Sequence, residues 1–303
     1  MIENRTKTIL VTGASGMLGF ELCKVLKGEE FNIIGTYNSN PELLNPGIER
    51  LKLDISSSKS VEQVRNKYKN ISAIIHCAAV TDVNYCELNR DECYRINVDG
   101  TKNIVMLAQR YDTPLLYVST PMVFSGDTGD YREEDIPQAL NYYGETKILA
   151  EQEVLNYKKG LIIRANPIGI RPKGAHPSFV QWFVRAAAEN RSFTLFNDVV
   201  INPISAKTFS YLVIDFLRNF RPGIIHLGSF NVVNKAEVWG VIRNHFPHFS
   251  GEVTEISVDE TSAGHIARRP KQMWLNVQKA IALGYEMPSW ETEARQVLSK
   301  IIK

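Results

Sequence analysis

The stretch Ile9-Leu-Val-Thr-Gly-Ala-Ser-Gly-Met-Leu-Gly-Phe-Glu-Leu22 passes from a β-branched run through a glycine turn into a helical pattern. Its glycines, Gly13, Gly16 and Gly19, have the spacing Gly-x-x-Gly-x-x-Gly. The first permits a tight turn, the second lets the backbone approach a pyrophosphate, and the third lets the helix pack on the strand. Because a strand pattern precedes the turn and a helix pattern follows it, the stretch predicts a dinucleotide site rather than an ordinary turn.

Strand and helix patterns alternate through the rest of the first half of the chain. We expect strands at residues 8–12, 32–36, 50–53, 73–77, 114–119 and 161–165. We expect helices at residues 17–27, 60–69, 91–110 and 143–157. This alternation predicts an α/β protein with a Rossmann-type, doubly wound parallel sheet.

The pattern changes after Pro167, because residues 171–177 are rich in Pro and Gly and predict a loop. Helices are expected near 178–189, 206–219 and 235–245, and a strand near 223–227. We therefore expect a smaller C-terminal substrate-binding lobe with at least one return to the main sheet. The predicted NAD(P)-binding Rossmann domain covers residues 1–170 plus about 200–232, and the predicted lobe covers about 171–199 and 233–303.

The composition excludes several classes of protein. A hydrophobic content of 44% and a net charge of +2 in 303 residues are typical of a soluble globular protein and do not favour a nucleic-acid partner. No apolar stretch approaches the roughly 20 residues that cross a membrane. The first residues are polar and contain no signal-like apolar run, so we expect a cytoplasmic protein with no membrane partner.

The histidines and cysteines do not have the spacing of metal ligands, so we expect no metal site. Cys23, Cys77, Cys86 and Cys93 lie inside or beside apolar runs. Reduced, buried thiols are therefore expected rather than disulfides.

Tyr143 and Lys147 are four residues apart and would share one face of a helix. There the Lys147 ammonium would favour phenolate, lowering the pKa of Tyr143 from about 10 toward neutrality. Such a phenol can give a proton to a ketone while a nicotinamide delivers hydride. The spacing alone is common on helices, so it gains its weight from the glycine turn upstream.

Val118-Ser-Thr-Pro-Met-Val-Phe124 ends a predicted strand in small hydroxyl residues. Because chemistry gathers at the carboxyl ends of strands in a doubly wound sheet, Thr120 could donate a hydrogen bond to a substrate carbonyl. The alternative is that the hydroxyl only stabilises the turn.

The end of the second strand bears on the choice of cofactor. Residues 36–39, Thr-Tyr-Asn-Ser, offer no carboxylate for a ribose diol and no arginine for a 2′-phosphate. We expect NADP(H) to be preferred, with NAD(H) as the alternative. Asp54 suits an acceptor for the adenine amino group, and it equally suits a helix N-cap.

With these motifs in order, the chain resembles the extended short-chain dehydrogenase/reductases, and within them the dTDP-4-dehydrorhamnose reductase branch. Segments spread over nearly the whole chain carry the resemblance: Ala78-Ala-Val-Thr-Asp-Val-Asn-Tyr-Cys-Glu87, Asn97-Val-Asp-Gly-Thr101, Tyr131-Arg-Glu-Glu-Asp-Ile-Pro137, Asn202-Pro-Ile-Ser-Ala206 and Ala267-Arg-Arg-Pro270.

The resemblance implies Thr120 as hydrogen-bond donor to the carbonyl, Tyr143 as proton donor, and Lys147 as the residue that binds the nicotinamide ribose. The expected cofactor-binding residues are Gly13, Ser15, Gly16, Met17, Leu18, Asn38, Asp54, Ile55, Cys77, Ala78, Ala79, Tyr143 and Lys147. The expected substrate-binding residues are Thr120, Asn166 and Arg269. Asn97 would brace the network beside the sheet.

Cations would hold the diphosphate of a nucleotide-sugar, and arginine suits phosphate. Arg171, Lys173, Arg268 and Arg269 lie in loop-like segments, and Arg269 is favoured because it belongs to the family-like Arg-Arg-Pro. Asn166 could be a substrate ligand or could cap the turn before Pro167.

The implied activity is NADPH-dependent reduction of a nucleotide-linked 4-keto-6-deoxysugar, most simply dTDP-4-dehydrorhamnose to dTDP-rhamnose for polysaccharide synthesis. The expected partner is the nucleotide-sugar, with a homodimer as a further expectation. Pro121 and Met122 depart from the family, which usually has an acid and an aromatic residue there, and Arg164-Ala-Asn-Pro-Ile-Gly169 is closer to epimerases and dehydratases.

Two alternatives therefore stay open. One is an NAD-dependent nucleotide-sugar epimerase or dehydratase. The other is a non-catalytic regulatory subunit like the methionine adenosyltransferase beta subunit, which shares the stretch like Tyr131–Pro137.

Overall fold

An eight-stranded sheet forms the larger part of the molecule, in the order β3-β2-β1-β4-β5-β6-β10 with β9 paired to β6. All of its strand pairs are parallel. The computed structural model describes residues 7–29, 31–172, 177–260 and 266–302. The strands are β1 (Lys7–Thr12), β2 (Phe31–Tyr37), β3 (Glu49–Lys52), β4 (Ala73–His76), β5 (Leu115–Ser119), β6 (Gly160–Ile168), β9 (Pro203–Ser205) and β10 (Gly223–Leu227).

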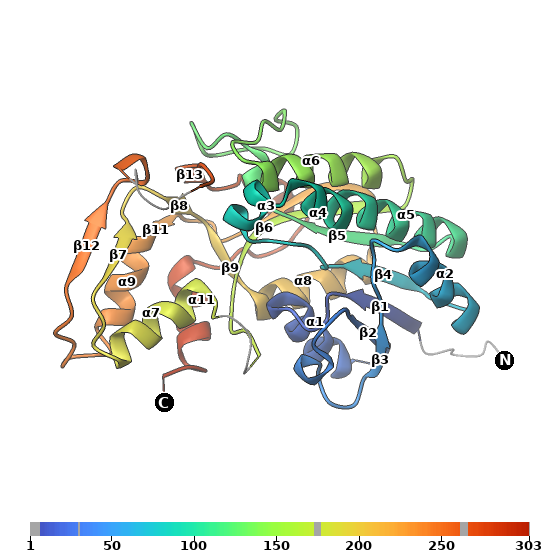
Figure 1. Cartoon of the computed structure of the whole chain (residues 1–303), viewed down its shortest axis with the longest axis horizontal. Coiled ribbons are helices and arrows are strands. Elements are labelled where there is room, and N and C mark those ends of the chain that lie inside the picture. The colour runs from blue at the N-terminus through green and yellow to red at the C-terminus, as the bar shows by residue number, and fades with distance from the viewer. Residues whose placement is uncertain (1–6, 30, 173–176, 261–265, 303) are drawn as a thin grey trace.

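Helices cover both faces of this sheet (Figure 1). Buried apolar residues of α1 (Met17–Lys27) and α8 (Ala206–Arg218) pack on one face. Those of α2 (Ser58–Lys67), α5 (Gly100–Tyr111) and α6 (Tyr142–Leu155) pack on the other. The predicted doubly wound α/β fold is confirmed, and the order in which successive strands are added reverses between β1 and β4, where such sheets bind ligands.

The helix expected at residues 91–110 is in fact divided. Short helices α3 (Val83–Leu88) and α4 (Arg90–Tyr94) lead into a π-helical turn at Arg95–Asp99, and α5 follows. No Pro or Gly within residues 95–99 marks the π turn, so the sequence pattern predicted one unbroken helix. Such turns inside helices are frequent at functional sites.

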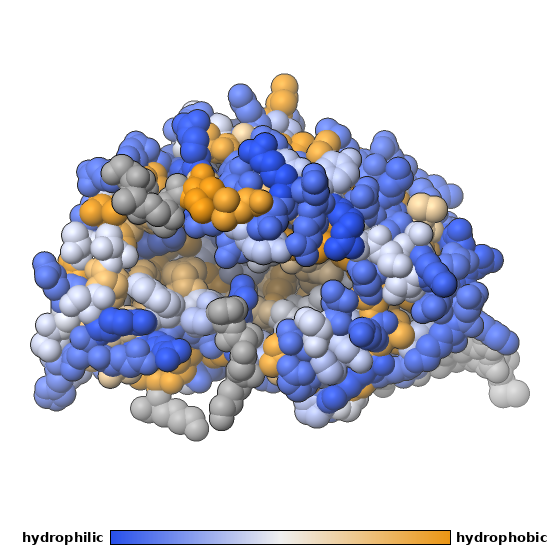
Figure 2. Space-filling view, in the orientation of Figure 1, coloured by the Kyte–Doolittle hydropathy of each residue, from blue (hydrophilic) through white to orange (hydrophobic). Residues whose placement is uncertain are grey.

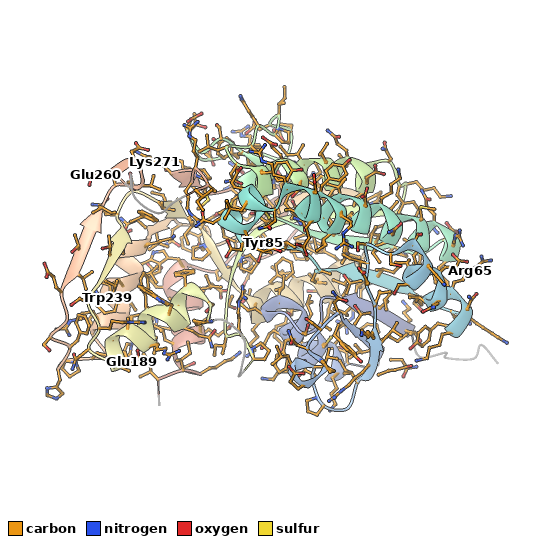
Figure 3. All side chains as sticks on the ribbon, viewed as in Figure 1. Arg65, Tyr85, Glu189, Trp239, Glu260 and Lys271 are labelled. Atoms are coloured by element: carbon orange, nitrogen blue, oxygen red, sulfur yellow. The ribbon has the colours of Figure 1, made fainter. Side chains whose placement is uncertain are left out.

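A second hydrophobic core lies beside the large sheet, at the left of Figure 1. Apolar side chains of α7 (Phe179–Ala188), α9 (Lys235–Arg243) and α11 (Trp290–Leu298) surround it, with Trp239 of α9 among them (Figure 3). Two small sheets complete this part: β7 (Phe193–Phe196) with β12 (Val253–Ile256), and β11 (Val233–Asn234) with β8 (Val200–Ile201) and β13 (Gln272–Met273).

The chain passes between the two cores more than once. After α7, β7 and β8, it returns to the large sheet through β9, α8 and β10, and then leaves again. This return agrees with the helix expected at residues 206–219 and the strand expected at 223–227. The remaining elements are α10 (Gln278–Ala282) and the 3₁₀ turns η1 (Pro41–Leu43), η3 (Pro121–Val123) and η4 (Val258–Glu260). The exact domain boundaries stay a prediction.

The four cysteines are free thiols, and Cys23, Cys86 and Cys93 are buried. Among the residues that the structure describes, no helix is both long enough and apolar enough to span a membrane.

Backbone contact explains why the turn after β1 needs glycine. Gly13 has a φ of +66°, and a Cβ there would lie 2.8 Å from the Ala78 backbone at the end of β4. A Cβ at Gly19 would overlap the Gly13 carbonyl oxygen. Gly16 is open by comparison, since its nearest neighbour would be that same oxygen at 3.3 Å. The turn, α1 and β4 therefore approach one another closely only because two side chains are missing.

This contact predicts a difference between two glycines in helices. Gly19→Ala should lower the free energy of unfolding by about 1–3 kcal/mol, because the turn must move to admit a methyl group. Gly240→Ala is the matched control: a Cβ there meets nothing within 4 Å, so it should be neutral or stabilise the protein by up to about 1 kcal/mol. Urea unfolding of both variants measures the difference, and equal stabilities would contradict the contact described here.

Candidate active site

A cleft of about 440 Å³ lies between the carboxyl ends of the large sheet's strands and the second core. The face shown in Figure 2 is hollowed between these two parts. The large sheet and its turns contribute Gly13, Gly16, Met17, Leu18, Gly19, Cys77, Ala79, Thr81, Val118, Ser119, Thr120, Tyr143, Lys147, Ala165, Asn166, Pro167 and Ile168. The remaining lining residues are Arg171, Phe179, Ile201, Lys235 and Met273. No carboxylate is among these lining residues, although three cations are: Lys147, Arg171 and Lys235.

The first turn of α1 faces the cleft with unused hydrogen-bond donors. Gly16 is its N-cap, so no side chain caps the helix, and the first turn has no acidic residue. No hydrogen bond among the described residues uses the amide N–H groups of Met17 and Leu18. Free amides at the positive end of a helix bind anions, so this turn fits the pyrophosphate of a dinucleotide.

Tyr143 lies in the first turn of α6 and is buried. Burial raises the pKa of its phenol above the usual value, and the nearby Cys86 thiol adds to the rise. Hydrogen bonding with Thr120 opposes this rise. The expectation that Lys147 would lower the pKa of Tyr143 toward neutrality is therefore wrong for the protein without ligands, because loss of solvent outweighs the spacing.

Lys147 lies one turn further along α6, also buried. Its Nζ donates a hydrogen bond to the Val118 carbonyl oxygen at 2.8 Å and lies 4.1 Å from the centroid of the Tyr117 ring. Burial lowers the pKa of Lys147 to about 8, while the negative charge of Glu151 opposes that shift. The ammonium is therefore the main form at neutral pH and is lost just above it.

Thr120 follows β5 and lines the cleft beside Tyr143. Its Oγ1 accepts a hydrogen bond from the Met122 amide at 3.2 Å and so caps the short helix η3. The interpretation that Thr120 stabilises the turn is confirmed, and its role as donor to a substrate carbonyl stays a prediction, since a hydroxyl that accepts from a turn can still donate its own proton. Thr120 follows β5 whereas Tyr143 and Lys147 belong to α6, and the structure brings all three to one cleft.

Asn97 braces the loop that forms one wall of the cleft. Its Oδ1 accepts from the Val80 amide at 2.8 Å, and its Nδ2 donates to the Val80 carbonyl and to Thr146 Oγ1, each at 3.0 Å. Thr146 belongs to α6, next to Lys147. The π-helical turn thereby ties the loop after β4 to the helix of the tyrosine, which agrees with the role expected for Asn97.

Buried charges lie behind Lys147. Glu151 of α6 and Arg164 of β6 form an ion pair, with an Arg164 Nη2 to Glu151 Oε2 distance of 2.6 Å and both side chains at most 3% exposed. Ser119 Oγ also donates to Glu151 at 2.5 Å. This group orients the carboxylate that supports the Lys147 ammonium, and the sequence offered no signal for it beyond residue type.

Several predicted cofactor residues lie outside the lining of the cleft: Ser15, Asn38, Asp54, Ile55 and Ala78. Asn38 is exposed just beyond the end of β2, whereas Ile55 is buried. Asp54 Oδ1 accepts from the Ser56 amide at 3.0 Å, and Ser57 is the N-cap of α2. The alternative that Asp54 caps a helix is therefore wrong, and the adenine contact stays a prediction.

Of the other two predicted substrate residues, one borders the cleft. Asn166 lines it and donates from Nδ2 to the Met273 carbonyl oxygen at 2.7 Å, so this side chain joins β6 to β13. Arg269 is not part of the lining. Its Nη2 donates to Asn84 Oδ1 at 3.4 Å, at the start of α3. Lys173 lies outside the described residues.

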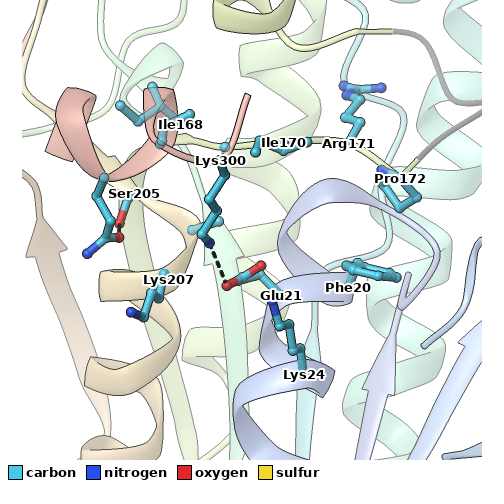
Figure 4. Close-up of a pocket in the computed structure, with 14 residues that line it drawn as sticks. Phe20, Glu21, Lys24, Ile168, Ile170, Arg171, Pro172, Ser205, Lys207 and Lys300 are labelled. Atoms are coloured by element: carbon cyan, nitrogen blue, oxygen red, sulfur yellow. Dashed lines mark hydrogen bonds and ion pairs between the residues drawn. The ribbon is translucent and has the colours of Figure 1, made fainter. Parts of the chain in front are cut away.

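Sequence reasoning missed Lys235, which lines the cleft at the start of α9. It also did not foresee a second hollow behind β6, lined by Lys24, Lys207 and Lys300 among others (Figure 4). There Lys300 is already paired with Glu21 at 3.2 Å, and Arg171 points away from that pair. The cleft with Tyr143 is thus the better candidate for an anionic ligand, since its lining has no carboxylate that would compete with the ligand for the cations.

Comparison with known proteins identifies the family of this chain. Residues 7–302 match the family described as the RmlD substrate binding domain. A dTDP-4-dehydrorhamnose reductase from Bacillus anthracis, solved in complex with NADP, is 27% identical with a TM-score of 0.85, covering 97% of this chain and 99% of that chain. The spore coat polysaccharide biosynthesis protein SpsK of Bacillus subtilis is 26% identical over 295 residues, 96% of this chain and 97% of that protein.

A shorter match is found to methionine adenosyltransferase 2 subunit beta of Pongo abelii, which is 33% identical over 167 residues. That match spans 55% of this chain and 48% of that protein. The family match, in contrast, runs from β1 to beyond α11 and includes the whole cleft. The chain therefore belongs to the RmlD substrate-binding domain family, within the extended short-chain dehydrogenase/reductases, which are NAD(P)-dependent oxidoreductases.

Proposed function

We propose that this protein reduces the 4-keto group of a nucleotide-linked 4-keto-6-deoxysugar with NADPH, and that dTDP-4-dehydrorhamnose is the substrate to test first. One observation carries the proposal: the free amides of the α1 turn, Thr120, Tyr143 and Lys147 line one cleft, and among the described residues of its lining are three cations and no carboxylate. The similarity to the Bacillus anthracis reductase supports this choice of substrate and of cofactor.

The residues divide between the two ligands. Gly13, Gly16 and the amides of Met17 and Leu18 would hold the pyrophosphate of the cofactor, and Lys147 would bind its ribose. When bound, NADPH supplies a hydride to the carbonyl carbon of the sugar. Asn166, Arg171 and Lys235 also line the cleft and would bind the nucleotide-sugar.

Tyr143 is the proton donor in this proposal. Reduction needs the acid form of the phenol, and the raised pKa keeps Tyr143 protonated at neutral pH in the protein without ligands. As the carbonyl carbon is reduced, the oxygen takes the proton from Tyr143, which leaves a phenolate that the Lys147 ammonium stabilises. Thr120 donates a hydrogen bond to the same oxygen and stabilises its developing charge.

The two residues that follow Thr120 favour reduction over dehydration. A dehydratase of this superfamily usually has an acid pair beside the threonine, whereas Pro121 is buried here and Met122 packs against apolar side chains. An epimerase keeps its NAD tightly bound, so the nucleotide released when the purified protein is denatured separates that alternative from a reductase.

A regulatory role is the second candidate, supported by the similarity to the methionine adenosyltransferase beta subunit over 167 residues. The chain spans about half of that relative, and the cleft residues are compatible with either role. Co-purification of a synthetase with no turnover of any ketosugar would favour it. A cytoplasmic location and a homodimer stay predictions from the sequence.

The Tyr143→Phe variant tests the proposed proton donor. Its rate of NADPH oxidation with dTDP-4-dehydrorhamnose, or with another nucleotide 4-ketosugar that the parent accepts, should fall at least about 100-fold, because the proton route is lost. NADPH affinity should stay near that of the parent. Tyr142→Phe is the matched control, since Tyr142 is adjacent on α6 but half-buried and stacked with Arg90, and its turnover should be normal. A fully active Tyr143→Phe variant would exclude this mechanism.

The pKa of Lys147 predicts how cofactor binding depends on pH. Binding the ribose favours the ammonium, and the pKa of Lys147 is about 8 in the protein without ligands. NADPH affinity should therefore be constant below that pH and should fall above it, approaching about tenfold per pH unit. Fluorescence titration from pH 7 to 9.5 measures this. Lys147→Met should bind weakly at every pH, and a parent protein with constant affinity would contradict the assignment.

A further inference from the structure

Lys235 reaches the cleft because of how a small sheet is paired. It is the first residue of α9 and follows β11 directly. In that sheet Val233 pairs with Ile201 of β8, and Ile201 pairs with Met273 of β13. Ile201 and Met273 line the cleft together with Lys235. The Lys235 side chain thus lies in a wall of the cleft whose residues are far from Tyr143 in the sequence.

The Lys235 ammonium has no counterion within the described residues. Glu237, the nearest acid along α9, is used by the capping box, where it accepts from the Asn234 amide at 2.8 Å. The pKa of Lys235 is lowered to about 8, mainly by burial and also by the positive charge of Arg269. Lys235 Nζ lies 5.5 Å from the centroid of the Phe196 ring.

Arg269 lies near Lys235, because its positive charge lowers the pKa of Lys235. Its guanidinium is held beside α3 by Asn84, and burial lowers the pKa of Arg269 while the carboxylate of Asp82 opposes the shift. Both cations are therefore largely removed from solvent, and Asp82 is the acid near Arg269. Like charges in such a place repel, and an anion bound between them would remove that cost.

We propose that Lys235 is a substrate-binding residue, which together with Arg269 holds the diphosphate of the nucleotide-sugar. This inference rests on the proposed function. Arginine can bind phosphate through two parallel hydrogen bonds, and lysine can supply a point charge to the second phosphate. The pyrophosphate of the cofactor belongs elsewhere, because the free amides are those of α1 at the large sheet, whereas Lys235 belongs to α9 in the part at the left of Figure 1.

Steady-state kinetics test this assignment. Lys235→Gln should raise the KM for the nucleotide-sugar at least about tenfold, because a charge-assisted contact in a desolvated site is lost. The KM for NADPH should stay unchanged, and kcat at saturating sugar should change little. Lys235→Arg should recover most of the loss. Lys102→Gln, on the exposed surface of α5, is the matched control and should behave as the parent.

Calorimetric binding of dTDP, UDP, GDP and CDP to the NADPH-saturated protein gives a readout that needs no turnover. The parent should bind at least one of these diphosphates, and Lys235→Gln should bind it at least about tenfold more weakly. If the parent binds and Lys235→Gln binds equally well, the role of Lys235 is wrong while the proposed function stands. If the parent binds none of the four diphosphates and turns over no nucleotide-sugar, both proposals fall. A rise in the KM for NADPH instead would assign Lys235 to the cofactor.

Discussion

The hydrogen bond from the Lys147 ammonium to the Val118 carbonyl is the contact on which the candidate site depends. A buried ammonium is costly unless it is paired, so this contact commits α6 to one position over the end of β5. Glu151 supports the charge from one turn further along α6, and it is itself held by Arg164 of β6. One connected set of charges therefore joins α6 to the two strands that carry Thr120 and Asn166.

The opposite wall of the cleft is attached to the large sheet through amide side chains. Asn166 donates to the Met273 carbonyl, and Asn202 exchanges hydrogen bonds with the Leu275 backbone at 2.9 and 3.0 Å. Buried amides that are satisfied in this way fix the backbone segments they join. The cleft thus has two walls with different electrostatics: free amides and a phenol on the sheet side, and unpaired cations on the side of the second core.

Protonation in this cleft is decided by burial more than by sequence spacing. The four-residue separation does place Tyr143 and Lys147 on α6 at one cleft, yet desolvation raises the pKa of the phenol and lowers that of the ammonium. Desolvation depends on β4, β5 and the loop braced by Asn97, which lie far away in the chain. For a reductase this arrangement is favourable, because the Tyr143 phenol is already protonated and the reaction needs it as a proton donor.

The sequence by itself determined the parallel α/β fold, the glycine turn and the Thr120, Tyr143 and Lys147 set, because these follow from short-range patterns: strand and helix periodicity, missing side chains at Gly13 and Gly19, and residue spacing along one helix. It could not show the π-helical turn, which leaves the helical pattern unbroken. Only the tertiary structure decided the protonation of Tyr143 and the place of Lys235 in the cleft. Both features depend on segments that are distant in the chain, because these segments exclude water from the cleft and bring charged groups close to the two side chains. The spacing of residues along the chain does not reveal such contacts.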